Sequence, residues 1–167
     1  MIAQSTSFSF LTNLVPGRRS SARWLRCGVV IAIFLVGPAP AGGASTVAGT
    51  ASSLVGGEVT VACEDLAQFG WWGAAEVGVP HIQLDHEICA VLAVAPRLRR
   101  GYLLRPSSGA SVLTLAHEAA HVRGIEGERE ADCFGMAHLH QTALALGYRP
   151  TQLPRLESQA DAVSECH

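Results

Sequence analysis

The chain has 167 residues, which fits one domain with a modest core, and 49% of them are hydrophobic. Its 12 basic residues are all arginine, and from residue 42 onward 8 arginines face 14 acidic residues, a formal charge of −6. An acidic region without a basic stripe argues against nucleic-acid binding.

Residues 1–41 have the layout of a secretory signal peptide. Arginines precede an apolar run at residues 27–36, and the small-x-small sequence Ala-Pro-Ala follows at 39–41. We therefore expect an extracytoplasmic protein that is either secreted or anchored to the cell membrane by its N-terminus. Residues 24–41 would form the membrane tether, and whether the signal is cleaved stays open.

Residues 42–57 are rich in glycine, serine and alanine and carry no charge. This composition is typical of a flexible linker. We expect the linker to separate a folded domain, residues 58–167, from the membrane or the cleavage site.

The first part of this domain is expected to contain a small sheet. Residues 59–63 alternate weakly and residues 81–84 follow a proline, so both segments predict short strands. Between them, residues 63–75 predict a short helix interrupted by glycines. Trp71 and Trp72 could anchor the core or line a cleft, and the core is the favoured placement.

Helices are expected in the second part of the domain. Asp85 can cap a helix that extends to the residue before Pro96. Residues 101–104 predict an edge strand along which an extended peptide could dock. Further helices are predicted at 111–122 and 127–146, each followed by a glycine stop signal, and a last short helix precedes the C-terminus.

Four cysteines follow the apolar run, and an even number in a small exported domain predicts two disulfides. They are Cys63, Cys89, Cys133 and Cys166. Four cysteines allow three pairings, and the sequence does not select one. No two of them have the close spacing of zinc ligands, so a zinc site built from thiolates is not expected.

The sequence His-Glu-Ala-Ala-His at 117–121 carries the main functional signal. His117 and His121 are four residues apart, so on a helix their imidazoles project from one face. This spacing suits two ligands of one tetrahedral zinc ion. Glu118 points to the side, where it is placed to hold and deprotonate a zinc-bound water as the catalytic base.

A third ligand is expected from the acidic segment after Gly124, where the chain must turn sharply. Glu128 and Asp132 share one helix face. Glu128 could therefore bind zinc while Asp132 accepts a hydrogen bond from the far ring nitrogen of a ligand histidine. Glu126 and Glu130 compete with Glu128, and Glu126 remains the main rival.

This pattern resembles the zincin metallopeptidases. The sequence Glu-Arg-Glu-Ala-Asp at 128–132 is similar to the gluzincin pattern, although the connection to it is shorter than in most gluzincins. The stretch 114–135, where the resemblance is specific, is also similar to small exported actinobacterial proteins with a His-Glu-x-x-His-x-x-Gly core. The resemblance implies zinc ligands His117, His121 and Glu128, the general base Glu118, and Asp132 as the partner of a ligand.

We therefore expect an α+β fold, mostly helical, with a zincin-like pair of site helices, a small sheet and two disulfides. The expected function is zinc-dependent hydrolysis of peptide bonds in a peptide or protein substrate. The alternative is a non-catalytic cell-envelope binding module stabilised by zinc. The domain's small size, about 110 residues, favours this alternative because it leaves little chain for specificity pockets.

Overall fold

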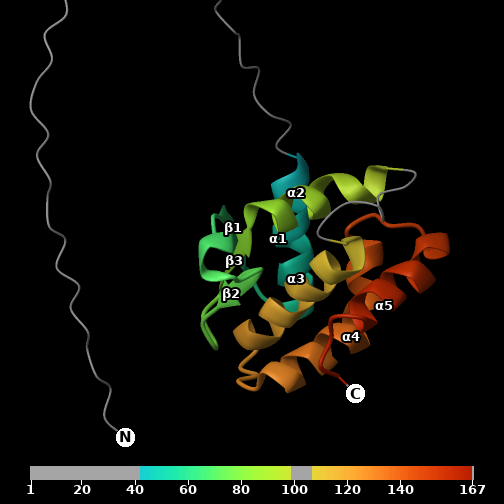
Figure 1. The fold of residues 1–167 in the computed structure, drawn as a ribbon. Helices are drawn as coiled ribbons and strands as arrows, with labels where there is room; N and C mark the ends of the chain where they lie inside the picture. Colours follow the sequence, from blue (N-terminus) through green and yellow to red (C-terminus); the bar gives the residue numbers. More distant parts are fainter. Residues whose placement is uncertain (1–41, 99–106, 167) are drawn as a thin grey trace, which may run out of the picture. The chain divides into compact units, whose positions relative to one another are not determined.

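Five α-helices and a three-stranded sheet make up residues 42–98 and 107–166, the part of the chain that the computed structural model describes (Figure 1). The expected mostly helical α+β class is confirmed. The helices and strands are α1 (Gly42–Val55), β1 (Thr60–Glu64), β2 (Gly73–Ala75), β3 (His81–Asp85), α2 (His86–Val94), α3 (Ser108–Val122), α4 (Glu128–Ala145) and α5 (Leu153–Asp161).

Two predictions fall on residues outside the described part: the signal peptide or anchor at 1–41, and the edge strand at 101–104. Within 42–98 and 107–166, no helix has the length and apolar character needed to cross a membrane.

Helix α1 occupies the segment for which the composition predicted a flexible linker, and that prediction was wrong. Val47, Ala51 and Leu54 lie on one helical face and are buried in the core. The helix contacts α2, α3 and β1. Burial of three apolar side chains at helical spacing therefore stabilises this segment as a helix despite its glycine and serine content. The folded unit begins earlier than residue 58.

The sheet has the order β1-β3-β2, with β1 parallel and β2 antiparallel to the central strand β3. Ile82 and Leu84 of β3 are fully buried, as expected for a central strand. The strands predicted at 59–63 and 81–84 are confirmed. The helix predicted at 63–75 is wrong, because this segment forms a 3-10 turn that ends at Gly70 (φ 74°) and then becomes the edge strand β2.

Asp85 joins the sheet to the segment before β2. One carboxylate oxygen caps α2, as predicted, by accepting from the backbone N–H of Glu87 at 2.9 Å. The other accepts from the backbone N–H groups of Leu66 and Ala67 at 3.1 and 3.0 Å. This buried side chain therefore fixes the connection that carries the two tryptophans.

Helix α3 lies at the centre of the fold and contacts all four other helices as well as β2 and β3 (Figure 1). It begins three residues before its predicted start because Ser107 caps it, accepting from the N–H of Ala110 at 3.2 Å. Helix α4 approaches α3 closely at Gly135, where a β-carbon would lie 2.7 Å from Leu113 Cδ1. Gly124 makes the turn between the two helices at φ 94°.

Each of two disulfides joins two parts of the fold. Cys63–Cys89 joins β1 to α2, and Cys133–Cys166 joins α4 to the segment after α5. The predicted number of disulfides is confirmed, and the structure selects one of the three pairings. Disulfides of this kind are typical of proteins outside the reducing cytoplasm.

Candidate metal centre

Three side chains from two helices converge at one point. His117 and His121 of α3 place their Nε2 atoms 3.0 Å apart. Glu128, the first residue of α4, places carboxylate oxygens 3.1 Å from His117 Nε2 and 3.7 Å from His121 Nε2. One donor atom from each of the three residues lies within 4.8 Å of the others, so the group could hold a metal ion.

The hydrogen bonds on the far side of each imidazole ring indicate which ring nitrogen carries the proton. His121 Nδ1 lies 2.7 Å from the carbonyl oxygen of Ile125, which can only accept, so Nδ1 carries a proton. His117 Nδ1 lies 2.7 Å from the carboxylate of Asp132, and the same reasoning applies. In the neutral imidazoles both Nε2 atoms are then acceptors that face a carboxylate. A cation is needed between them, either a bound metal or a proton.

The two histidines and the glutamate differ strongly in exposure. The side chains of His117 and His121 are 16% and 8% exposed, whereas Glu128 is 76% exposed. The histidines are therefore held within the fold, and the carboxylate closes the group from the solvent side.

Asp132 lies where the sequence placed it, behind His117. It is one turn along α4 from Glu128, so a single helix supplies both a metal-binding candidate and the hydrogen-bond partner of a candidate ligand histidine. A carboxylate at this position fixes the tautomer and the orientation of the ring. Its second oxygen accepts from the backbone N–H of Glu165 at 2.7 Å, a contact that the sequence did not suggest.

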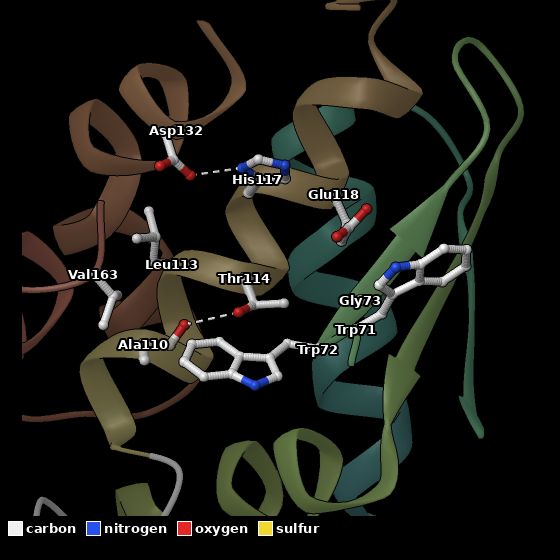
Figure 2. Close-up of a pocket in the computed structure, with 10 residues that line it drawn as sticks. All are labelled: Trp71, Trp72, Gly73, Ala110, Leu113, Thr114, His117, Glu118, Asp132 and Val163. Atoms are coloured by element: carbon white, nitrogen blue, oxygen red, sulfur yellow. Dashed lines mark hydrogen bonds and ion pairs between the residues drawn. The ribbon is translucent and has the colours of Figure 1, made fainter. Parts of the chain in front are cut away.

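The carboxyl group of Glu118 lies next to the edge strand β2, beside Gly73 (Figure 2). Glu118 is only 6% exposed. Burial raises the pKa of Glu118 from 4.5 to about 7, His117 nearby lowers it, and Glu128 raises it. A carboxyl group with a pKa near neutrality can both accept and donate a proton.

Among the three candidate glutamates, the structure brings only Glu128 to the histidines within the described residues. Glu126 lies in the turn and is exposed. Glu130 instead folds back against Gly127 at the start of α4. Of the two glutamates between which the sequence left the choice open, Glu128 therefore lies with the histidines and Glu126 does not.

Two pockets meet at this centre. One, of about 230 Å³, is lined by apolar side chains and opens onto His117 and Glu118 (Figure 2). The other, of about 400 Å³, runs along the whole of β2 and reaches His121 and Glu128. The centre is therefore open to a ligand from both sides of Glu118.

The pocket walls correct the expected place of the tryptophans. Trp71 and Trp72 are 56% and 47% exposed rather than in the core. Trp71 lines both pockets, and Trp72 lines the smaller one together with Leu113 and Val163. The favoured placement in the core is wrong, and the alternative placement at a cleft is the one observed, because both side chains line pockets beside α3 and β2.

Comparison of the chain with protein-family models, with curated proteins and with solved structures gives no match.

Proposed function

We propose that the protein is an extracytoplasmic zinc-dependent peptidase. The observation that carries the proposal is the convergence of His117, His121 and Glu128 beside the buried carboxyl group of Glu118. All four side chains line the pockets that open onto the centre.

The donor set fits zinc better than a hard cation. Two imidazole nitrogens and one carboxylate are typical of catalytic zinc sites, whereas calcium and magnesium prefer oxygen ligands alone. Nitrogen ligands of one tetrahedral zinc ion stand about 3.4 Å apart, close to the 3.0 Å between the two Nε2 atoms. Three protein ligands would leave room for water or substrate, and a zinc ion held by them would supply a Lewis acid that polarises a carbonyl and acidifies water.

Glu118 is suited to move the proton. It takes a proton from the water whose oxygen bonds to the scissile carbonyl carbon, and it gives that proton to the amine nitrogen when the C–N bond breaks. Burial raises the pKa of this carboxyl group in the metal-free protein, which favours the donating step. Asp132 keeps His117 in the tautomer that presents Nε2 to the ion.

The substrate we infer is an extended peptide with an apolar side chain. Among the described residues, β2 has β3 on one side only, so the other edge is free to pair with a peptide. Trp72, Leu113 and Val163 form apolar walls of the pocket beside Glu118. The free edge would align the peptide backbone, and the pocket would take a side chain next to the scissile bond.

The metal is tested by elemental analysis and zinc titration of the protein. We expect one zinc ion per chain, lost in His117→Ala and His121→Ala and weakened in Glu128→Ala. Glu126→Ala and Glu130→Ala are matched controls that keep the ion. Zinc at a thousand times its Kd should stabilise the fold by about 4 kcal/mol. A protein that binds no zinc would refute the proposal.

Catalysis is tested with peptide mixtures analysed by mass spectrometry. The zinc protein should cleave peptides, and Glu118→Gln should retain zinc while losing activity by at least about a hundredfold. Zinc binding without any cleavage would instead support a non-catalytic envelope module in which the ion serves stability alone.

A further inference from the structure

We propose that the segment after α5, tied by the Cys133–Cys166 disulfide, positions the metal ligand His117 and thereby sets metal affinity. The inference rests on the proposed zinc site and adds a part of the chain that follows the two site helices. Glu165, through its backbone N–H, is the positioning residue.

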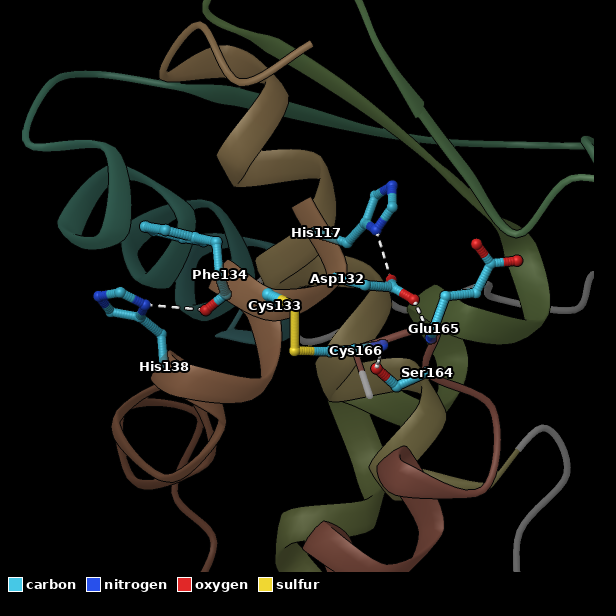
Figure 3. The surroundings of a disulfide bond; sticks show 8 residues. All are labelled: His117, Asp132, Cys133, Phe134, His138, Ser164, Glu165 and Cys166. Atoms are coloured by element: carbon cyan, nitrogen blue, oxygen red, sulfur yellow. Dashed lines mark hydrogen bonds and ion pairs between the residues drawn. A yellow bond between two sulfur atoms is a disulfide. The ribbon is translucent and has the colours of Figure 1, made fainter. Parts of the chain in front are cut away.

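A short series of contacts connects this segment to the site (Figure 3). The backbone N–H of Glu165 donates to Asp132 Oδ2 at 2.7 Å. Asp132 Oδ1 accepts from His117 Nδ1, also at 2.7 Å. Because each carboxylate oxygen has its own donor, the plane of the carboxylate is fixed and the His117 ring is fixed with it. The segment therefore acts on the ring that presents Nε2 to the metal.

The disulfide joins the immediate neighbours of these two residues. Cys133 follows Asp132 on α4, and Cys166 follows Glu165. Their Cα atoms are 4.8 Å apart, so the bond holds the Glu165 N–H at the Asp132 carboxylate. The bond thus restrains the donor that orients the ligand.

The other hydrogen bonds given for the described residues of this segment are local. The backbone N–H groups of Val163 and Ser164 both donate to the carbonyl of Ala160, at the end of α5. The N–H of Cys166 donates to Ser164 Oγ at 3.0 Å. These bonds shape the turn, but they do not tie it to α4. The same segment contributes Val163 to the pocket wall, so its position affects the space beside Glu118 as well.

The chain contains a matched control for the disulfide. Cys63–Cys89 spans 26 residues and Cys133–Cys166 spans 33, so removal of either should relax the unfolded chain to a similar extent. Cys63–Cys89 ties β1, at the far edge of the sheet from β2, to α2. A general loss of stability would therefore change the zinc Kd equally when either disulfide is removed. Loss of positioning would change the zinc Kd only when Cys133–Cys166 is removed.

The test is the zinc Kd of the whole protein, measured by competition with a chromophoric chelator. Loss of a partner that orients a ligand typically weakens metal binding by 10–100-fold. We expect about a tenfold weaker Kd for Cys133→Ser with Cys166→Ser, and no change for Cys63→Ser with Cys89→Ser. Equal Kd values for the two double variants would overturn the proposal.

A second pair of variants keeps the disulfide and changes only the donor. Glu165→Pro lacks the backbone N–H and should weaken zinc binding about tenfold, whereas Glu165→Ala keeps the N–H and should bind like the wild type. The absorption spectrum of the cobalt-substituted protein should change in Glu165→Pro and not in Glu165→Ala. Identical spectra and Kd values for the two variants would refute the role of this hydrogen bond.

The coupling through Asp132 is tested in a double-mutant cycle. Once Asp132→Asn has removed one acceptor oxygen, loss of the Cys133–Cys166 bond should weaken zinc binding by less than about twofold further. Fully additive effects would show that the disulfide acts by another route. A wild type that binds no zinc would refute the proposed function as well, whereas zinc binding that is indifferent to these changes would refute this inference alone.

Discussion

The backbone of Gly73 lies directly against the carboxyl group of Glu118. A β-carbon at residue 73 would stand 2.6 Å from Oε1 and 2.8 Å from Cγ of Glu118. Edge strand β2 can therefore bury the proposed base only because residue 73 has no side chain.

Gly73→Ala should displace Glu118 without removing a metal ligand. A misplacement of about 1 Å at a catalytic group can reduce the rate about a hundredfold, so we expect kcat/KM to fall at least tenfold while the zinc Kd is unchanged. Gly57→Ala is the control, since a β-carbon there meets no atom within 4 Å. Full activity in Gly73→Ala would show that the position of Glu118 against β2 is not needed.

Glu118 should also make the stability of the metal-free protein depend on pH. Burial raises its pKa from 4.5 to about 7, so ionisation is harder in the folded than in the unfolded chain. The free energy of unfolding should therefore fall as pH rises from about 4.5 to 7, by about 3 kcal/mol in all. Glu118→Gln lacks this loss, so its stability relative to the wild type should increase over this range. Urea unfolding at several pH values measures the difference, and a constant difference would contradict the prediction.

Trp72→Ala should change substrate preference more than metal binding. The indole forms a wall of the pocket beside Glu118. Its loss should reduce kcat/KM by about 10–100-fold for peptides with a large apolar side chain next to the scissile bond, and less for peptides with alanine there. Phe69→Ala is the control, because Phe69 is 62% exposed and lines neither pocket at the site. An equal loss for both peptide classes would argue against a specificity role.

Leu54→Ala tests whether α1 belongs to the folded unit. Leu54 is 6% exposed and part of the core, so its truncation should cost about 2–5 kcal/mol in the free energy of unfolding. Leu144→Ala removes the same atoms from a side chain that is 46% exposed and should cost about 0.5 kcal/mol or less. Chemical unfolding measures the loss of stability in each variant. Equal small losses would indicate that residues 42–57 are a linker and not part of the folded unit.

The parts of the fold that were predicted from the sequence depend on local signals. Asp85 caps α2, and Gly124 and Gly147 end α3 and α4 with positive φ angles, as their residue types suggested. The spacing of His117 and His121 placed both rings on one face because both lie in one helix.

The parts that could not be predicted depend on contacts between distant segments. The burial of α1 depends on surfaces supplied by α2, α3 and β1, which its own composition does not reveal. The approach of Gly73 to Glu118 joins residues 45 positions apart. The bond from Glu165 to Asp132 uses a backbone N–H, which any residue except proline would offer, so no side-chain pattern points to it.

The uneven exposure of the three metal-binding candidates implies an order of assembly. Both histidine rings are already held by Asp132 and by the Ile125 carbonyl, so they need little rearrangement when an ion binds. Glu128 is largely in solvent, so its side chain can move with less loss of packing than either ring. Capture would begin at a rigid two-nitrogen half-site, and release would begin with the carboxylate.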